Sequence, residues 1–385
     1  MSKYIWLVLS LNAFSTSVAH SAEWSLTSKL DPAVKYDDNV FMSENEQGST
    51  QYSISPTLNA RRLTDSNEIS LSGGYNVKRF TSISRLNRQD PFIRLNSSLQ
   101  TERSTYGLGA SYSQASSRNT AEDDTGDFTT ESTLTTKTVS PSYRYQLTER
   151  DSLSVGVSYS ERTYWTTNFG DTTSKSINSS WSHQLSERLS GGLSFYLANF
   201  QSDGQTVSSD DDNYNLSVTS TYNLSELWKL NGQVGFRKLN SHRNSSGITD
   251  TSSSTGSSFD FGANRKSELG SFSAGLSRSL SPSSSGDVNE QDRINFNWSK
   301  KITELLSTSI TTSYLESTSA SITGTNKRKY FNFSPAIKWQ FERDFGLNLT
   351  YNYRQQKQSS VNSKVSSNAV MITLIYNWDG IRLSR

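Results

Sequence analysis

The chain has 385 residues and a net charge of only +2, with 38 Lys and Arg against 36 Asp and Glu. Its hydrophobic content of 32% is low for a soluble globular domain, whereas its aromatic content of 11% argues against simple disorder. The absence of cysteine excludes a disulfide framework and a thiolate metal site. A polar chain with many aromatic residues is typical of a transmembrane β-barrel, because only every second strand residue faces lipid.

The N-terminus has the pattern of a secretory signal peptide. Lys3 supplies a positive charge, residues 4–14 form an apolar stretch, and small residues follow as far as Ala22. The apolar stretch is shorter than the roughly 20 residues of a spanning helix, so a membrane anchor is the less favoured alternative. After Ala22 no segment is long and apolar enough for a membrane helix. We therefore expect residues 1–22 to be a signal peptide, and the protein to reside in the outer membrane of a Gram-negative bacterium.

From Trp24 onward, stretches of alternating apolar and polar residues predict β-strands of roughly 9–13 residues. Soluble strands are commonly about 5–6 residues long, whereas a tilted strand that crosses a membrane needs the longer span. The alternation is clearest in residues 331–341, 347–354 and 370–378. Strand length therefore favours a membrane barrel over a soluble sandwich.

A short acidic turn recurs about every 40 residues between these stretches. The acidic residue of each turn is at position 65, 102, 149, 187, 226, 268, 304 or 342. Longer polar segments alternate with the turns, at residues 37–50, 81–90, 117–135, 165–172, 202–212, 241–257, 281–288, 318–327 and 357–365. Short turns at one end and long loops at the other are typical of outer-membrane barrels, in which the turns are periplasmic and the loops extracellular.

The connections give the strand number. Eight turns and nine loops predict an all-β, antiparallel, up-and-down barrel of 18 strands, with 16 as the alternative. Residues 23–379 would form this barrel and residues 380–385 a short periplasmic tail. One of the long loops could fold inward as a constriction, and the sequence does not indicate which.

A Ser-Pro or Asp-Pro step recurs within the expected strands, at Pro32, Pro56, Pro141 and Pro335. Proline removes a donor from the hydrogen-bonded ladder and is normally confined to edges, strand starts or bulges. Because a closed barrel has no edge, we expect local bulges at these positions. Common ancestry of duplicated hairpins is an equally good explanation of the repeat.

Basic residues dominate the face opposite the apolar one. If the apolar face meets lipid, the residues that point into the lumen are Lys35, Arg61, Lys78, Arg94, Arg144, Arg162, Arg237, Lys338 and Arg354. Such a lumen would attract an anionic solute or polymer. The alternative is that these charges solvate the interior and pair with acidic residues of the turns and loops.

No pattern indicates an enzyme, a cofactor or a metal centre. The histidines are His20, His183 and His242, and there is no Gly-rich nucleotide loop, nucleophile elbow or HExxH motif. Two acidic runs, at residues 122–124 and 210–212, have the oxygen ligands that divalent cations bridging lipopolysaccharide would need. Solvated loop tips are the favoured explanation of both runs.

Short motifs at both ends of the mature chain resemble the β-barrel porin type 2 group. They are Tyr36-Asp37-Asp38-Asn39-Val40-Phe41 and the ending Asn377-Trp378-Asp379-Gly380-Ile381-Arg382-Leu383-Ser384-Arg385. The resemblance covers essentially the whole mature chain. It implies a barrel linked to exopolysaccharide or capsule secretion, with the secreted polysaccharide and a periplasmic export complex as partners beside outer-membrane lipid and lipopolysaccharide.

The first functional hypothesis is therefore a porin-like channel that exports an exopolysaccharide through a wide, wet, basic lumen. A general or anion-selective diffusion porin for small solutes is the second, and a structural or adhesive barrel with partner-binding loops is the third. No segment indicates a subunit interface.

Overall fold

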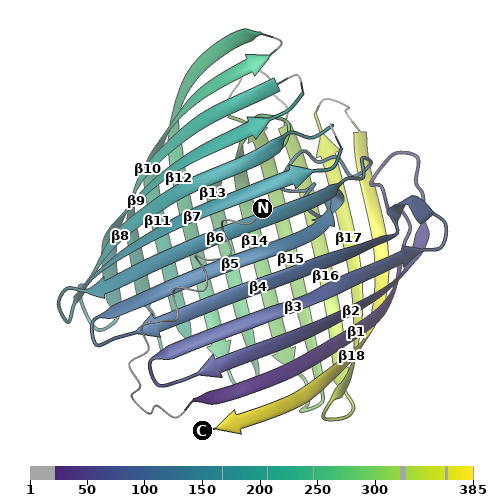
Figure 1. Ribbon diagram of the computed structural model, residues 1–385, viewed down its shortest axis with the longest axis horizontal. Coiled ribbons are helices and arrows are strands. Elements are labelled where there is room, and N and C mark those ends of the chain that lie inside the picture. Colours follow the sequence, from purple (N-terminus) through teal and green to yellow (C-terminus); the bar gives the residue numbers. More distant parts are fainter. Residues whose placement is uncertain are drawn as a thin grey trace, which may run out of the picture.

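The computed structural model describes residues 22–166, 168–205, 207–245, 247–320, 327–359 and 363–384. They form one closed antiparallel sheet of 18 strands, in which β1 pairs with both β2 and β18 (Figure 1). The predicted fold class and strand number are thus confirmed. The expected signal peptide, apart from Ala22, lies outside the described residues.

The strands are long, and two short 3-10 helices accompany them. Their bounds are β1 (Glu23–Asp37), β2 (Ser49–Leu63), β3 (Asn67–Phe80), η2 (Ser84–Leu86), β4 (Arg88–Gln100), β5 (Ser104–Ser116), η3 (Ser117–Asn119), β6 (Thr133–Gln146), β7 (Asp151–Tyr164), β8 (Asp171–Gln184), β9 (Leu189–Asp203), β10 (Val207–Asn223), β11 (Trp228–Ser245), β12 (Ile248–Ser267), β13 (Gly270–Pro282), β14 (Val288–Lys301), β15 (Leu306–Ser319), β16 (Lys327–Gln340), β17 (Phe345–Gln358) and β18 (Ser363–Ser384).

Large apolar side chains are exposed at alternate positions of the strands. Val34 and Tyr36 of β1 are 45% and 53% exposed, and Leu349 and Tyr351 of β17 follow the same rule. A closed barrel pairs its backbone groups within the sheet, so this apolar outer face suits the hydrocarbon of a bilayer. In the part of the chain that the structure describes, no helix is long and apolar enough to cross a membrane.

Six of the eight short turns are held by the Ser or Thr residue that precedes the acidic one. Thr148 Oγ1 accepts hydrogen bonds from the backbone N–H of Arg150, at 3.2 Å, and of Asp151, at 3.0 Å. Ser or Thr side chains make the same bond, to the N–H three residues on, at positions 64, 101, 186, 225 and 303. This local bond favours the turn over continued strand, so the repeat is explained by its hydroxyl residue. The end of the barrel that carries these turns is called the turn end.

The prolines do not form bulges, so that prediction was wrong. Beside Pro56 the β2–β3 register runs from Ile54↔Val77 to Thr57↔Gly74, which leaves two residues unpaired on each strand. The ladder is interrupted in the same way beside prolines 32, 141 and 335, on one side of each strand only. The missing N–H removes ladder bonds but needs no extra residue, because the other neighbouring strand stays paired.

The bulge lies instead at Gly380, in the segment expected to be a free tail. Residues 381–384 of β18 pair with β1, from Leu26↔Ile381 to Glu23↔Ser384, and the register shifts between Leu26 and Ser28. Gly380 has φ +75°, and a Cβ atom there would be 1.6 Å from the carbonyl oxygen of Leu26. Only glycine fits this position. The barrel wall therefore extends past residue 379, to Ser384.

Two expected loops are mostly strand. β9 ends at Asp203 and β10 begins at Val207, while β11 ends at Ser245 and β12 begins at Ile248, so the expected loops at 202–212 and 241–257 are wrong. These hairpins rise beyond the rest of the barrel in Figure 1. Their Ser, Asn and Asp content suggested loops, but inward residues of the same strands, Phe200 and Leu239, pack in a buried cluster with Val288.

Candidate functional site

A loop of residues 117–132, the crossing loop, leaves the wall between β5 and β6 and crosses the lumen. Arg328 of β16 donates hydrogen bonds to the carbonyl oxygens of Ala121, Glu122 and Asp124, at 3.2, 2.6 and 3.1 Å. Gln291 of β14 donates to the carbonyl of residue 123 at 2.6 Å. β5 and β14 are half the circumference apart in a closed sheet of eighteen strands. The crossing loop therefore spans the barrel from wall to wall.

The carboxylate of Asp124 fixes the far side of the crossing loop. It accepts hydrogen bonds from Ser283 Oγ at 2.7 Å, from the backbone N–H and Oγ of Ser284 at 2.8 Å each, and from the Tyr164 hydroxyl at 2.9 Å. Asp124 is buried, and a buried carboxylate requires such donors. Within the acidic run at 122–124, Asp123 is exposed but Asp124 is a buried anchor, so the expectation of a solvated loop tip was wrong for Asp124.

Apolar contacts complete the packing inside the lumen. Ala121 and Phe128 of the crossing loop are buried with Met42 of the β1–β2 loop and with Leu315 and Tyr330 of the opposite wall. The rings of Phe128 and Tyr330 are stacked with centroids 6.0 Å apart. The interior therefore contains a small hydrophobic core, which stabilises the loop in a folded position.

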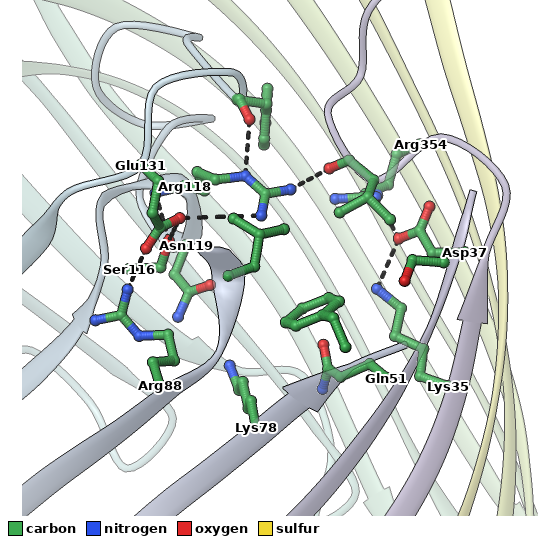
Figure 2. Close-up of a pocket in the computed structure, with 15 residues that line it drawn as sticks. Lys35, Asp37, Gln51, Lys78, Arg88, Ser116, Arg118, Asn119, Glu131 and Arg354 are labelled. Atoms are coloured by element: carbon green, nitrogen blue, oxygen red, sulfur yellow. Dashed lines mark hydrogen bonds and ion pairs between the residues drawn. The ribbon is translucent and has the colours of Figure 1, made fainter. Parts of the chain in front are cut away.

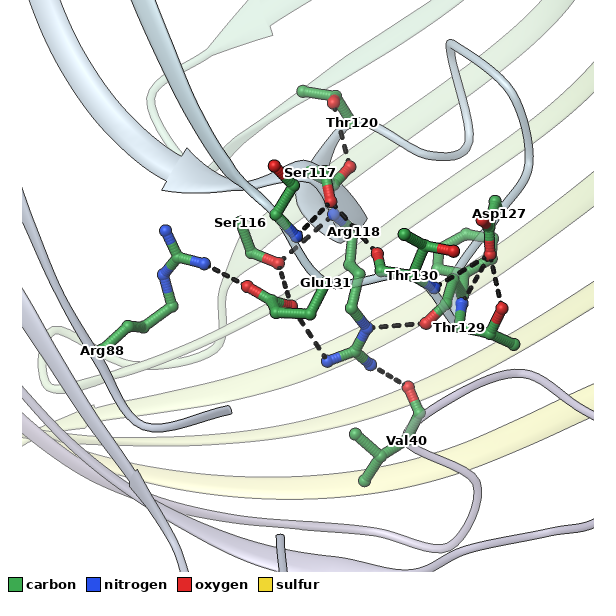
Figure 3. A network of polar contacts seen from close by, with 12 residues as sticks. Val40, Arg88, Ser116, Ser117, Arg118, Thr120, Asp127, Thr129, Thr130 and Glu131 are labelled. Carbon is green, nitrogen blue, oxygen red and sulfur yellow. Dashed lines mark hydrogen bonds and ion pairs between the residues drawn. The ribbon is translucent and has the colours of Figure 1, made fainter. Parts of the chain in front are cut away.

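Arg118 joins the near side of the crossing loop to the β1–β2 loop (Figure 3). Its Nε donates to the carbonyl of Phe128 at 2.7 Å, another guanidinium nitrogen donates to the carbonyl of Val40, and its Nη1 lies 4.0 Å from the carboxylate of Glu131. Its guanidinium also lies over the ring of Phe41. Burial lowers the pKa of Arg118 to about 10, against the opposing effect of Glu131, so it remains cationic at neutral pH.

A basic pocket remains beside these two loops (Figure 2), with a cavity volume of about 100 Å³. Its basic lining residues are Lys35, Lys78, Arg88, Arg118 and Arg354, its acidic ones are Asp37 and Glu131, and its apolar ones are Val40, Phe80, Leu86 and Phe128. The volume allows a few water molecules or one small solute. The excess of cations favours an anion.

Most of the basic residues of the pocket have an acidic partner. Lys35 and Arg354 both contact Asp37 Oδ2 at 2.8 Å. Arg88 contacts Asp90 at 2.7 Å and also pairs with Glu131. These ion pairs hold the loop-side ends of the strands in place.

The nine residues predicted to face the lumen lie on strand faces opposite the exposed apolar side chains, as Lys338 does between the exposed Ile337 and Trp339. Three of them, Lys35, Lys78 and Arg354, come together in the basic pocket. The other six lie elsewhere on the wall. Arg61 pairs with Glu68, Arg237 pairs with Glu290, and Arg94 lies over the ring of Phe92. Arg144, Arg162 and Lys338 also lie outside the pocket. Their role as a substrate path remains a prediction.

Sequence reasoning missed Arg88 and Arg118. Both fall in segments that were expected to be loops, so strand alternation could not predict whether either side chain faces the lumen or the lipid. For Arg88 a signal exists, because it precedes Asp90 by two residues and a strand places both on one face. For Arg118 no local pattern predicts that its loop folds inward.

The remaining candidates do not form a site. Asp210 and Asp212 lie in β10 and accept hydrogen bonds from Asn199, at 2.6 and 3.0 Å. His183 contacts Asp151 at 2.8 Å near a turn, and His242 lies within β11. Across the described ranges, no group of three or more His, Cys, Asp or Glu side chains could hold a metal ion.

No family model and no curated protein matches this chain. Among solved structures it is similar to Acinetobacter baumannii OccAB4, at 10% identity and a TM-score of 0.50, over 94% of this chain and 98% of that one. It is also similar to the ferric citrate transporter FecA in its unliganded form, at 10% identity and a TM-score of 0.50, over 86% of this chain and 60% of that one.

At this identity the likeness shows the fold. The chain has the closed antiparallel β-barrel fold of outer-membrane porins. Neither structure connects the chain with exopolysaccharide or capsule secretion.

Proposed function

We propose that the protein is an outer-membrane channel for the diffusion of small anionic solutes. The observation that carries this proposal is the crossing loop, which spans the lumen and is held on the opposite wall by Arg328 and Asp124. An anchored loop divides the lumen, so the wide, open channel expected for polysaccharide export disagrees with this arrangement. The diffusion porin, the second hypothesis from the sequence, agrees with it.

Charge supports the preference for anions. Five basic side chains line the pocket between the crossing loop and the wall, against two acidic ones. Rings and clusters of Lys and Arg at a constriction concentrate anions and repel cations. The solute would pass by diffusion along this side of the lumen, with no chemical step.

The test is the reversal potential of the purified protein in a planar bilayer under a KCl gradient. We expect a reversal potential whose sign shows that chloride permeates more readily than potassium. We also expect a small single-channel conductance. A potential of the opposite sign would contradict the preference for anions. A large conductance, of the size that an unobstructed eighteen-stranded lumen allows, would contradict the constriction.

A further inference from the structure

Lys78 differs from the other basic residues of the pocket. Each of the other four contacts a carboxylate within the pocket or beside it. In the described part of the chain, no residue makes an ion pair or a hydrogen bond with the ammonium group of Lys78. In Figure 2 this side chain rises from β3 into the space between Arg88 and Gln51.

The ammonium of Lys78 has no direct partner among the described residues. Lys78 is half-buried and lines the cavity, and the carboxylates of Asp90 and Glu131 attract its charge only from beyond hydrogen-bonding distance. The nearby carboxylates of Asp90 and Glu131 are both bound by Arg88. A solute anion that enters the pocket could contact the Lys78 ammonium directly without breaking an ion pair of the protein.

The surroundings of Lys78 indicate the kind of anion. The side-chain amides of Gln51 and Asn119 line the same pocket and, among the described residues, make no hydrogen bond of their own. Val40, Leu86 and Phe128 add apolar surface. One free cation, free amide donors and an apolar wall suit a carboxylate on a small organic body better than a bare inorganic ion.

We propose that Lys78 is the anion-binding residue of the channel and that its ligand is a small organic monocarboxylate. The other four basic residues add to the positive charge of the pocket, but their ion pairs hold the loops and strand ends and leave them less available for direct contact with a solute. This inference rests on the proposed function, since it assigns the preference for anions to one side chain.

The experiment compares Lys78→Met with Lys78→Arg and Lys338→Met in planar bilayers. Lys338 also faces the lumen, from β16, but lies outside the pocket, so Lys338→Met is a matched control for the lost charge. The chloride current is measured while butyrate is added, and phosphate is added in a parallel series. Each variant is first checked for the same shift in gel mobility on heating as the wild type.

We expect butyrate to block the wild-type current saturably. Lys78→Met should raise the half-blocking concentration about tenfold or more, because the variant loses a charge-assisted hydrogen bond to the solute. Lys78→Arg should keep most of the block, and Lys338→Met should leave it nearly unchanged.

Three results would overturn the inference. They are an unchanged block in Lys78→Met, an equal loss in Lys338→Met, and a tighter block by phosphate than by butyrate. In each case an anion-selective wild type would leave the proposed function intact. A cation-selective wild type would instead contradict the proposed function itself.

Discussion

At the scale of single residues, Asp124 contributes most to fixing the crossing loop. Its carboxylate receives four hydrogen bonds from Ser283, Ser284 and Tyr164, which belong to two other parts of the barrel. Truncation to alanine removes the acceptor and leaves these buried donors unpaired, at a cost of about 1–3 kcal/mol. This loss destabilises the conformation in which the crossing loop is packed across the lumen. The conformation in which the loop is detached from the wall therefore becomes more populated.

We predict that Asp124→Ala raises the mean single-channel conductance and adds slow current fluctuations. Glu44→Ala is the matched control, because Glu44 is an exposed acidic residue of the β1–β2 loop. Identical current traces for Asp124→Ala and the wild type would show that the anchor does not hold the constriction.

Glu122 makes the packing of the same loop dependent on pH. Burial, and then the adjacent charge of Asp123, raise the pKa of the Glu122 carboxyl above its usual value, although Arg293 opposes them. A raised pKa in the packed state means that packing is favoured below the ordinary carboxyl pKa of about 4.3. The advantage is lost as the pH rises through the raised pKa.

We therefore predict that current fluctuations increase as the pH is raised from about 4 toward neutrality. Glu122→Gln removes the titrating group and should flatten this dependence. An unchanged pH profile in Glu122→Gln would assign the dependence to another group.

At the scale of elements, the repeated turn is best explained by its hydroxyl residue. Thr148 accepts two backbone hydrogen bonds and donates one to Asp151 at 2.7 Å, whereas the side chain of Glu149 is exposed. We predict that Thr148→Val lowers the free energy of unfolding in detergent by about 1 kcal/mol, and that Glu149→Gln changes it by less than about 0.5 kcal/mol. Urea titration followed by tryptophan fluorescence measures both, and a larger loss in Glu149→Gln would reverse this assignment.

The bulge at Gly380 gives a second test at this scale. In Gly380→Ala the new side chain would be strained by the left-handed backbone conformation and would clash with the carbonyl oxygen of Leu26. We therefore expect the free energy of unfolding to fall by more than about 2 kcal/mol and the pairing of β1 with β18 to form more slowly during folding. Gly247→Ala separates the two causes, because Gly247 has φ +85° with nothing within 4 Å of an added Cβ. Equal losses in the two variants would show that the contact with Leu26 has no effect.

These elements also show how far the sequence predicts the fold. Turn spacing and strand alternation were enough for the barrel and its eighteen strands, because both are local patterns. The same local reasoning placed loops at 202–212 and 241–257, where polar strands are instead stabilised by Leu239 and its distant neighbours. It also assigned bulges to the prolines and missed Gly380, whose role depends on Leu26, more than 350 residues away in the sequence.

The candidate site was less predictable than the fold. Strand alternation placed Lys35, Lys78 and Arg354 on the inner face but could not bring them together, since that depends on which strands are neighbours around the closed sheet. The inward position of the crossing loop depends on contacts of Arg328 and Ser284 with Asp124, which are far apart in sequence. No pattern within residues 117–132 indicates these contacts.

At the scale of the whole molecule, a loop fixed across the lumen converts a wide barrel into a narrow one. An eighteen-stranded sheet alone encloses an aqueous channel. At the end of the barrel opposite the turn end, the crossing loop and the β1–β2 loop are packed together inside it by Arg118, Phe128 and Met42. In the proposed channel the barrel would supply the passage through the membrane, while the loops and the basic pocket would determine the size and charge of the solute.

Liposome swelling tests this account most directly, with the wild type and Asp124→Ala reconstituted at equal density. The wild type should admit a small monocarboxylate such as butyrate quickly, admit a neutral sugar of similar size more slowly, and exclude a long oligosaccharide, while Asp124→Ala should admit larger sugars. Rapid entry of the long oligosaccharide through the wild type would contradict the small-solute channel and favour polysaccharide export.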